Sequence, residues 1–253
     1  MKLAINATFN PSGGSKSQLV NMLKYFYQAK DIEIVIYIKR NNLSLVQDIN
    51  QSNVKVIISK FAGINTGTRV IWEQTILPFL LLKDKIDILF CPGNIAPYFS
   101  PIKTVQWIGT IGPFHKDFYR HFSITEKIKL YINKIIMYKS AQQSDAVIFE
   151  SNYTMRLFID EYKVSAERSY VINIGKSKSF YPINQQEGIT LSDKYDSFKS
   201  YALCVSHLYA YKNIPRMIEA FAIAKRITES DHKLLIAGNK KSNKYYNQSL
   251  SCT

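Results

Sequence analysis

Short apolar segments alternate with longer amphipathic ones along most of the chain. The apolar segments are rich in β-branched side chains, which is typical of buried strands. Strands are predicted at residues 2–6, 33–38, 54–58, 87–91 and 103–108, and at the start of 144–153. Apolar residues recur at helical spacing after residue 17, over residues 69–82 and after residue 123. This alternation predicts an α/β fold with a parallel sheet.

The last part of the sequence predicts a second strand-helix-strand unit. Residues 201–205 and 233–238 have the length and composition of strands, and apolar residues at helical spacing begin at Ile214. Lys212 precedes this helix, where a cation beside unpaired backbone N–H groups suits an anionic phosphate. The alternative is that Lys212 only solvates a loop. Residues 185–199 are polar and lack periodicity, which indicates a linker.

Composition limits the class of protein. The 253 residues, of which 46% are hydrophobic, can form one large or two small packed domains. The three cysteines are far apart and suggest neither a metal site nor a disulfide framework, which favours a reducing cytoplasm. The N-terminus does not have the pattern of a signal peptide, and the most apolar segment, residues 71–82, is too short to cross a bilayer. We therefore expect a soluble, cytoplasmic chain.

The chain carries a net charge of +14, from 33 basic and 19 acidic residues. Nucleic acid, an anionic membrane surface and an anionic small molecule are the partners that such a charge suits. The sequence contains no zinc-finger spacing, RNA-binding aromatic motif or helix-turn-helix pattern. A membrane surface or a phosphorylated substrate is therefore favoured over nucleic acid, although an AT-rich coding sequence would also enrich lysine.

A pair of glycines, Gly13 and Gly14, lies between the first strand and the first helix. Glycines there let the backbone approach a ligand and leave N–H groups for a phosphate, and Lys16 adds positive charge. The spacing to Lys16 does not fit a Walker A loop. Ordinary turn glycines are the alternative interpretation.

The segment 205–238 resembles the donor-sugar domain of family 4 glycosyltransferases. The family pattern V-G-R-L, K-N, A-F and L-x-I-x-G corresponds here to Val205-Ser206-His207-Leu208, Lys212-Asn213, Ala220-Phe221 and Leu234-Ile236-Gly238. His207 replaces the arginine of the family, which weakens the expected grip on phosphate. Residues 144–153 resemble the family segment A-D-x-V-I-x-x-S, and residues 171–182 resemble the end of its first domain.

This resemblance implies a GT-B architecture with two Rossmann-like domains. The first domain, residues 1–184, is expected to be complete, residues 185–199 to be the linker, and residues 200–253 to be part of a donor-binding domain. No E-x7-E motif, which the family uses to hold the donor sugar, follows Gly238. We therefore expect a chain truncated in its second domain, whose activity on its own stays open.

The resemblance also implies an activity and a set of site residues. Family members transfer a sugar from a nucleotide-sugar with retention of configuration, generally without a catalytic metal, and no cofactor is expected. Lys212 is expected to stabilise the departing phosphate. The expected donor-binding residues are Gly13, Gly14, Lys16, Ser206, His207, Lys212 and Gly238. The expected acceptor-binding residues, on two loops that follow strands, are Asn94, Thr110 and His115.

Two functions remain open at this point. The first is a glycosyltransferase that acts on a glycan or lipid-linked acceptor in the synthesis of cell-envelope polysaccharide such as lipopolysaccharide. The second is a non-catalytic module, derived from such an enzyme, that binds an acceptor or a membrane surface. The helix predicted after Ser123 begins with a capping box and carries several lysines. It is either an ordinary amphipathic helix or, with His115, Lys116 and Arg120, a surface for anionic lipid at the inner face of the membrane.

Overall fold

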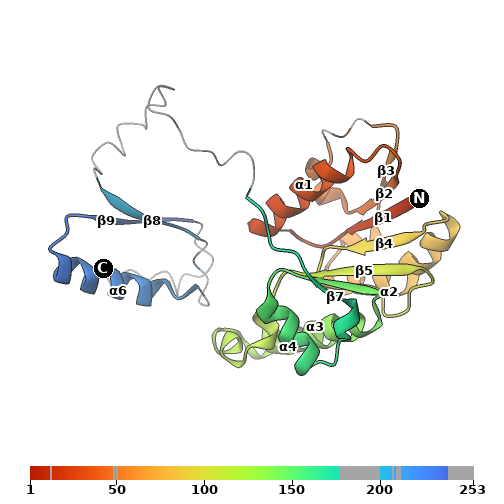
Figure 1. Ribbon diagram of the computed structural model, residues 1–253. Coiled ribbons are helices and arrows are strands. Elements are labelled where there is room, and N and C mark those ends of the chain that lie inside the picture. Colours follow the sequence, from red (N-terminus) through yellow and green to blue (C-terminus); the bar gives the residue numbers. More distant parts are fainter. Residues whose placement is uncertain are drawn as a thin grey trace, which may run out of the picture. The chain divides into compact units, whose positions relative to one another are not determined.

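The computed structural model describes residues 1–11, 13–47, 49, 51–176, 200–206, 208 and 212–238. The chain divides into two compact units, Met1–Ser179 and Phe180–Thr253 (Figure 1). The predicted linker, residues 185–199, lies outside the described residues. Its bounds, and those of the predicted domains on either side, therefore stay predictions.

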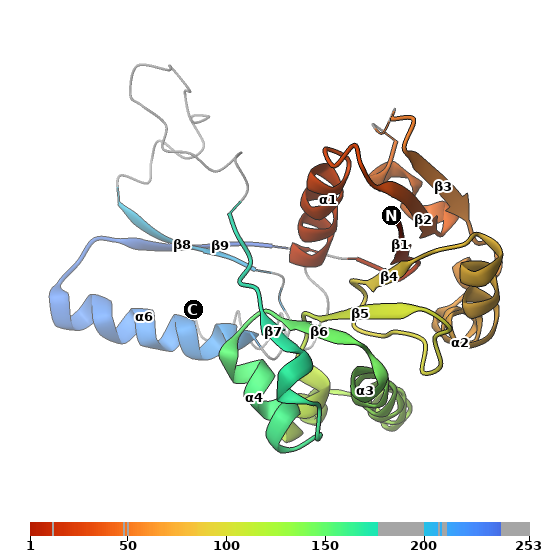
Figure 2. The same cartoon turned by 45° about the vertical axis from the view of Figure 1, so that its right-hand side comes forward.

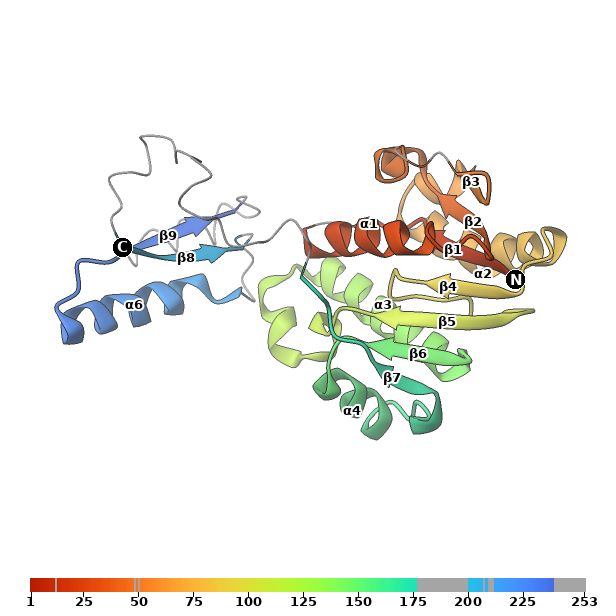
Figure 3. The ribbon, with the colours of Figure 1, turned by 45° about the horizontal axis from the view of Figure 1, so that its top comes forward.

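The first unit is built on a seven-stranded sheet in the order β3-β2-β1-β4-β5-β6-β7. Every described pair of neighbouring strands is parallel, and in Figure 3 the arrowheads of β4, β5 and β6 point the same way. The strands are β1 Lys2–Ala7, β2 Glu33–Ile38, β3 Val54–Ile58, β4 Ile88–Cys91, β5 Lys103–Ile108, β6 Ala146–Phe149 and β7 Ser169–Val171. The predicted parallel α/β sheet is confirmed, and β7 is an additional strand that the hydrophobic pattern did not predict.

Helices form most of the connections between successive strands and cover the sheet, whereas β4 and β5 are joined without a helix. The longer ones are α1 Gly14–Phe26, α2 Thr66–Lys83, α3 Ile124–Gln143 and α4 Asn152–Asp160. The short 3₁₀ helices are η1 Arg40–Leu45, η2 Phe61–Gly63, η3 Gly112–Phe114, η4 Lys116–His121 and η5 Ala166–Arg168. Figure 2 shows α1 on the opposite side of the sheet from α3 and α4.

Alternate residues of the central strands enter cores on opposite faces of the sheet. Ile5 and Ile36 pack with Leu19 and Leu23 of α1. Their sequence neighbours on β1 and β2 pack with α2 on the other face. Successive side chains of a strand point to opposite faces, so strands covered on both sides are apolar throughout rather than alternating. This explains the continuous apolar segments of the sequence.

Two helices begin earlier than the pattern of apolar residues predicts. The first was expected after residue 17 and the second at residue 69, whereas α1 begins at Gly14 and α2 at Thr66. In α2 the cause is a capping box, in which the Asn65 side chain accepts a hydrogen bond from the Thr68 N–H at 2.9 Å. The capping box predicted at Ser123 and Glu126 is confirmed at the start of α3.

The described part of the second unit contains β8 Tyr201–Val205, α6 Ile214–Thr228 and β9 Lys233–Ala237. The two strands are parallel, as the strand-helix-strand pattern predicts. Leu208, Ile214 and Ile218 form a small core against one face of this pair. On the other face, Leu203 and Val205 are 58% and 76% exposed. Among the described residues of the second unit, this face of the strand pair is therefore an exposed apolar surface.

A buried polar cluster joins the end of β1 to α2. The Asn6 amide donates a hydrogen bond to Glu73 Oε1 at 2.9 Å, and the Thr8 hydroxyl lies 2.7 Å from Asn6 Oδ1. Arg69 Nε lies 3.6 Å from the same Glu73 oxygen. Among the described residues, Glu73 Oε2 has no hydrogen-bond partner. Burial raises the pKa of Glu73, against the opposing effects of Arg69, Asn6 and Thr8.

The raised pKa of Glu73 predicts a pH-dependent stability. The folded protein holds the proton of Glu73 more tightly than the unfolded chain does, so this contribution to stability is present below the ordinary pKa of 4.5. It is lost as the pH rises through the folded-state pKa. Relative to Glu73→Gln, the free energy of unfolding and the Tm of the wild type should therefore fall on going from low to neutral pH.

Thermal unfolding of both proteins from about pH 4.5 to about pH 8 measures this difference. Glu161→Gln, which changes an exposed carboxylate at the end of α4, is the matched control and should show a constant difference from wild type. If the Tm of the wild type rose with pH relative to that of Glu73→Gln, the pKa of Glu73 would not be raised in the folded protein.

Candidate functional site

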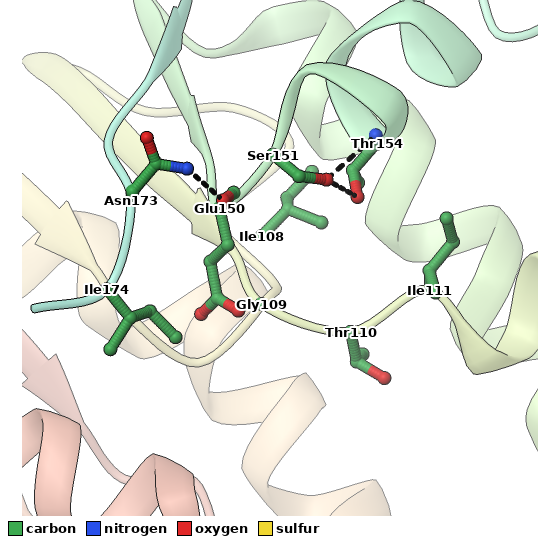
Figure 4. A pocket seen from close by; sticks show the side chains of 9 residues that line it. All are labelled: Ile108, Gly109, Thr110, Ile111, Glu150, Ser151, Thr154, Asn173 and Ile174. Atoms are coloured by element: carbon green, nitrogen blue, oxygen red, sulfur yellow. Dashed lines mark hydrogen bonds between the residues drawn. The ribbon is translucent and has the colours of Figure 1, made fainter.

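A cavity of about 400 Å³ opens at the carboxyl ends of β5 and β6 (Figure 4). Its polar lining residues are Gly109, Thr110, Glu150, Ser151, Thr154 and Asn173. Gly109 and Thr110 directly follow β5, and Glu150 and Ser151 directly follow β6. In open parallel sheets ligands bind outside the carboxyl ends of the strands.

The strand order places this edge of the sheet near a topological switch point. From β1 the chain continues outward through β2 to β3, and from β4 it continues in the opposite direction through β5, β6 and β7. In open parallel sheets, ligands bind at the point where the connections after two neighbouring strands run in opposite directions. The Gly13–Gly14 pair follows β1 and Asn94 follows β4.

The carboxylate of Glu150 is held by two distant side chains. Trp107 Nε1 donates a hydrogen bond to Glu150 Oε1 at 3.0 Å, and Gln18 Nε2 donates to the same oxygen at 3.1 Å. No described residue donates a hydrogen bond to the other oxygen, Oε2. Figure 4 shows the carboxylate beside Gly109, and a Cβ at that position would lie 2.5 Å from Oε1. Gly109 is therefore required for this arrangement.

Asn94 shapes the wall of the cavity from a strained position. Its φ of 67° is in the left-handed region, which asparagine tolerates better than most residues. Its Oδ1 accepts hydrogen bonds from the N–H groups of Gly109 at 2.7 Å and Thr110 at 3.1 Å. Gln106 Nε2 also donates to the Asn94 carbonyl at 2.9 Å. The Asn94 side-chain oxygen thus holds the loop after β5.

The N-terminus of α4 forms another part of the cavity. Ser151 is the N-cap of this helix, and its hydroxyl accepts a hydrogen bond from the Thr154 N–H at 3.2 Å. The amide of Asn173 donates to the Glu150 carbonyl at 3.1 Å and fixes the segment after β7 against the end of β6. These contacts, drawn in Figure 4, join neighbouring polar groups of this wall.

The structure brings only some of the expected acceptor-binding residues together. Thr110 lines the cavity, and Asn94 contacts its loop. His115 is not among the lining residues. Its ring stacks on that of Tyr153, with 6.2 Å between the ring centroids and 4° between the planes.

The predicted glycine loop has the backbone geometry that requires glycine. Gly13 has a φ of 55° and precedes the first residue of α1. A Cβ at Gly14 would meet nothing within 4 Å, so the space beside this residue is open. Gln18, one turn further along α1, contacts Glu150. The glycine loop and the cavity therefore lie at the same edge of the sheet.

In the second unit, Ser206 follows β8, Gly238 follows β9, and Lys212 precedes α6. Because β8 and β9 are parallel, these residues lie at one edge of their sheet. Ser206 N–H donates to the Ala237 carbonyl at 2.8 Å, and Lys212 is exposed. His207 lies outside the described residues.

Sequence reasoning did not find Glu150, Trp107 or Gln18. The signal in the sequence that could have identified Glu150 is its position directly after an apolar strand, at the edge of the sheet where ligands bind. The partners of that residue are 43 and 132 positions away in the sequence, so no local pattern joins them.

Two classes of feature are absent from the described part of the chain. Its His, Cys, Asp and Glu residues form no group of three that could hold a metal ion. None of its helices combines the length and apolarity that crossing a membrane requires.

Residues 12–175 match the family model described as Glycosyltransferase Family 4. No curated protein matches the chain. A glycosyltransferase from Rickettsia africae ESF-5 has a similar structure, with a TM-score of 0.66 and 16% identity over 99% of this chain and 64% of that one. Anabaena Alr3699/HepE, in complex with UDP and glucose, has a TM-score of 0.63 and 15% identity over 100% of this chain and 65% of its own.

WaaG, described as a glycosyltransferase involved in lipopolysaccharide biosynthesis, has a TM-score of 0.64 and 12% identity over 100% of this chain and 67% of its own. Identities this low establish the fold alone. The GT-B-like α/β fold expected from the sequence is confirmed by these structures. The chain spans 64% and 65% of the length of the first two.

The role of Asn94 predicts a selective loss of stability. Asn94→Ala removes both hydrogen bonds and places a less tolerant residue at positive φ, which should lower the free energy of unfolding by about 1–3 kcal/mol. Asn94→Asp keeps the accepting oxygen and should lose less than about 1 kcal/mol. Urea unfolding measures both values. Equal losses in the two variants would show that Oδ1 does not hold the loop.

Proposed function

Because residues 12–175 match its family model, the chain belongs to glycosyltransferase family 4, and we propose that it transfers a sugar from a nucleotide-sugar to a glycan or lipid-linked acceptor. The single observation that carries this proposal is the Gly13–Gly14 loop at the same sheet edge as the Glu150 cavity. The UDP and glucose of the Anabaena complex support a nucleotide-sugar donor. The described role of WaaG supports an acceptor in cell-envelope polysaccharide or lipopolysaccharide synthesis.

We assign the donor phosphates to two groups of residues, one in each unit. In the first unit, Gly13 and Gly14 open the N-terminus of α1, where the helix dipole favours an anion, and Lys16 is exposed nearby. In the second unit, Lys212 has the catalytic role of countering the charge that develops on the departing nucleoside diphosphate. Ser206, His207 and Gly238 complete the proposed donor site on the pattern of the family.

We assign the acceptor to the cavity after β5 and β6. Thr110 presents a hydroxyl group to it, Asn94 positions the Thr110 loop, and His115 on the following segment contributes from outside the lining residues. The reaction needs no cofactor in this scheme, because the leaving nucleotide is neutralised by backbone N–H groups and lysine.

The acceptor is proposed to be presented by an anionic membrane surface at the inner face of the cell membrane. On α3, Ile124, Ile128 and Tyr131 form an apolar stripe that is 77%, 55% and 58% exposed. Lys127 and Lys129 lie on the same helix, and the chain carries a net charge of +14. Apolar side chains bordered by lysine fit the headgroup region of an anionic bilayer, where both the burial of apolar area and the charge favour binding.

Two substitutions test the donor site by calorimetric titration with UDP. Lys212→Ala should weaken binding about 10-fold or more, because a charge-assisted contact to phosphate contributes about 1.5–3 kcal/mol. Gly14→Ala should leave the fold intact, since its Cβ meets nothing within 4 Å, but should obstruct a phosphate at this position. Lys225→Ala, in the last turn of α6, is the matched control.

The result separates the two functions left open by the sequence. Wild-type affinity for UDP in all three variants would contradict the proposed donor site. Nucleotide binding without sugar transfer to any acceptor would instead favour the non-catalytic module.

The membrane proposal is tested by sedimentation with phosphatidylglycerol-containing vesicles. The double change Ile128→Ser and Tyr131→Ser should reduce binding about 10-fold or more, because each apolar side chain contributes about 1.5–3 kcal/mol when fully buried. The control is Ile223→Ser on α6, because the Ile223 side chain is exposed to a similar degree, at 50%. Equal binding of neutral and anionic vesicles, or of both variants, would argue against this surface.

A further inference from the structure

The two oxygens of Glu150 have different surroundings. Trp107 and Gln18 both donate to Oε1, at 3.0 and 3.1 Å, so this oxygen is occupied and the carboxylate is fixed in orientation. The described residues place no hydrogen-bond donor on Oε2. No cation of the described part lies within ion-pair distance of Glu150. Among the described residues, the two neutral donors on Oε1 are the groups that compensate its charge.

Several neighbouring polar groups of the cavity are bonded to one another, while the Thr110 hydroxyl also lines it. The N–H groups of Gly109 and Thr110 already bond to Asn94. The Ser151 hydroxyl accepts from Thr154, and the Asn173 amide donates to the Glu150 carbonyl. A ligand that fits this wall must bring its own donors to the charged oxygen, because an unpaired charge at a half-buried site loses solvation without compensation.

We propose that Glu150 Oε2 determines acceptor specificity by accepting a hydrogen bond from a hydroxyl group of an uncharged sugar. A phosphate or carboxylate at the same place would bring a second negative charge against Glu150 and would be rejected. This inference rests on the proposed function, because it takes the cavity as the acceptor site. It adds the substrate class that the cavity selects.

The position of Glu150 in the sequence agrees with a selective role. In the family segment A-D-x-V-I-x-x-S, which residues 144–153 resemble, the position before the serine is unspecified. The serine itself, Ser151, caps α4, and the apolar positions belong to β6. Glu150 itself directly follows β6, at the edge of the sheet where ligands bind.

The proposed selection of acceptors also explains why residues from two other elements support the Glu150 carboxylate. Gln18 comes from α1 and Trp107 from β5, so the carboxylate is braced from two elements rather than by its own loop. A binding group that is fixed before the ligand arrives discriminates better than a mobile one, because no ordering cost falls on the bound state.

The test compares wild type with Glu150→Gln on a glycan array. The array pairs neutral oligosaccharides with counterparts that carry a phosphate, sulfate or uronic acid. Glutamine keeps the shape and can accept from Trp107 and Gln18 with its oxygen, but it presents an NH₂ donor to the cavity. Wild type should prefer the neutral glycans by about 10-fold or more, and Glu150→Gln should lose that preference.

Gln18→Ala separates specificity from a structural effect. It removes one support of Oε1 but leaves the charge, so it should weaken binding and keep the preference for neutral glycans. If Glu150→Gln failed to fold, as judged by circular dichroism, the wild-type ratio between neutral and acidic glycans would still decide the question. The proposal would be overturned if the wild type bound acidic glycans as well as neutral ones, or if it bound no neutral glycan. An unchanged ratio of neutral to acidic binding in Glu150→Gln would also overturn it.

A UDP titration on the same proteins distinguishes failure of this inference from failure of the proposed function. Unchanged UDP affinity in Glu150→Gln, with an altered glycan ratio, supports both. Wild type that selects neutral glycans but does not bind UDP would overturn the transferase while leaving the role of Glu150 in place. UDP binding without any glycan preference would overturn only the role of Glu150.

Discussion

Burial of the parallel sheet on both faces is the constraint from which the rest of the first unit follows. Parallel connections must cross over the sheet, and α1, α2, α3 and α4 make four of these crossings and cover the apolar faces. Ile5 packs under α1 while its neighbour Ala4 packs under α2. The same connectivity puts every strand's carboxyl end at one edge, so loops far apart in the sequence meet there.

Most of the polar groups at the end of β1 and in the middle of α2 are hydrogen-bonded to one another. Asn6, Thr8 and Glu73 Oε1 are joined by hydrogen bonds between the end of β1 and the middle of α2, with Arg69 beside them. Burying a carboxylate is costly, and the raised pKa of Glu73 expresses that cost. The cluster fixes how α2 lies on the sheet next to the loop that follows β1.

Hydrogen bonds between distant residues also fix the polar groups around the cavity at the carboxyl edge of the sheet. Asn94 holds the loop after β5 through two backbone N–H groups, and Trp107 and Gln18 hold the carboxylate of Glu150. Each of these contacts joins residues at least 15 positions apart in the sequence. Rigid elements can thus position a polar group more accurately than the loop that carries it.

The sequence by itself determined the parallel α/β sheet, the glycine loop after the first strand and the capping box at Ser123, because each depends on local periodicity or on residues a few positions apart. The starts of α1 and α2 were predicted too late, since apolar spacing does not detect the capping of Asn65 or the turn at Gly13. Only the tertiary structure decided that Glu73 is buried and that Glu150 faces a cavity. Their partners lie 67 and 132 residues away, and such contacts depend on how the strands are ordered, which periodicity does not encode.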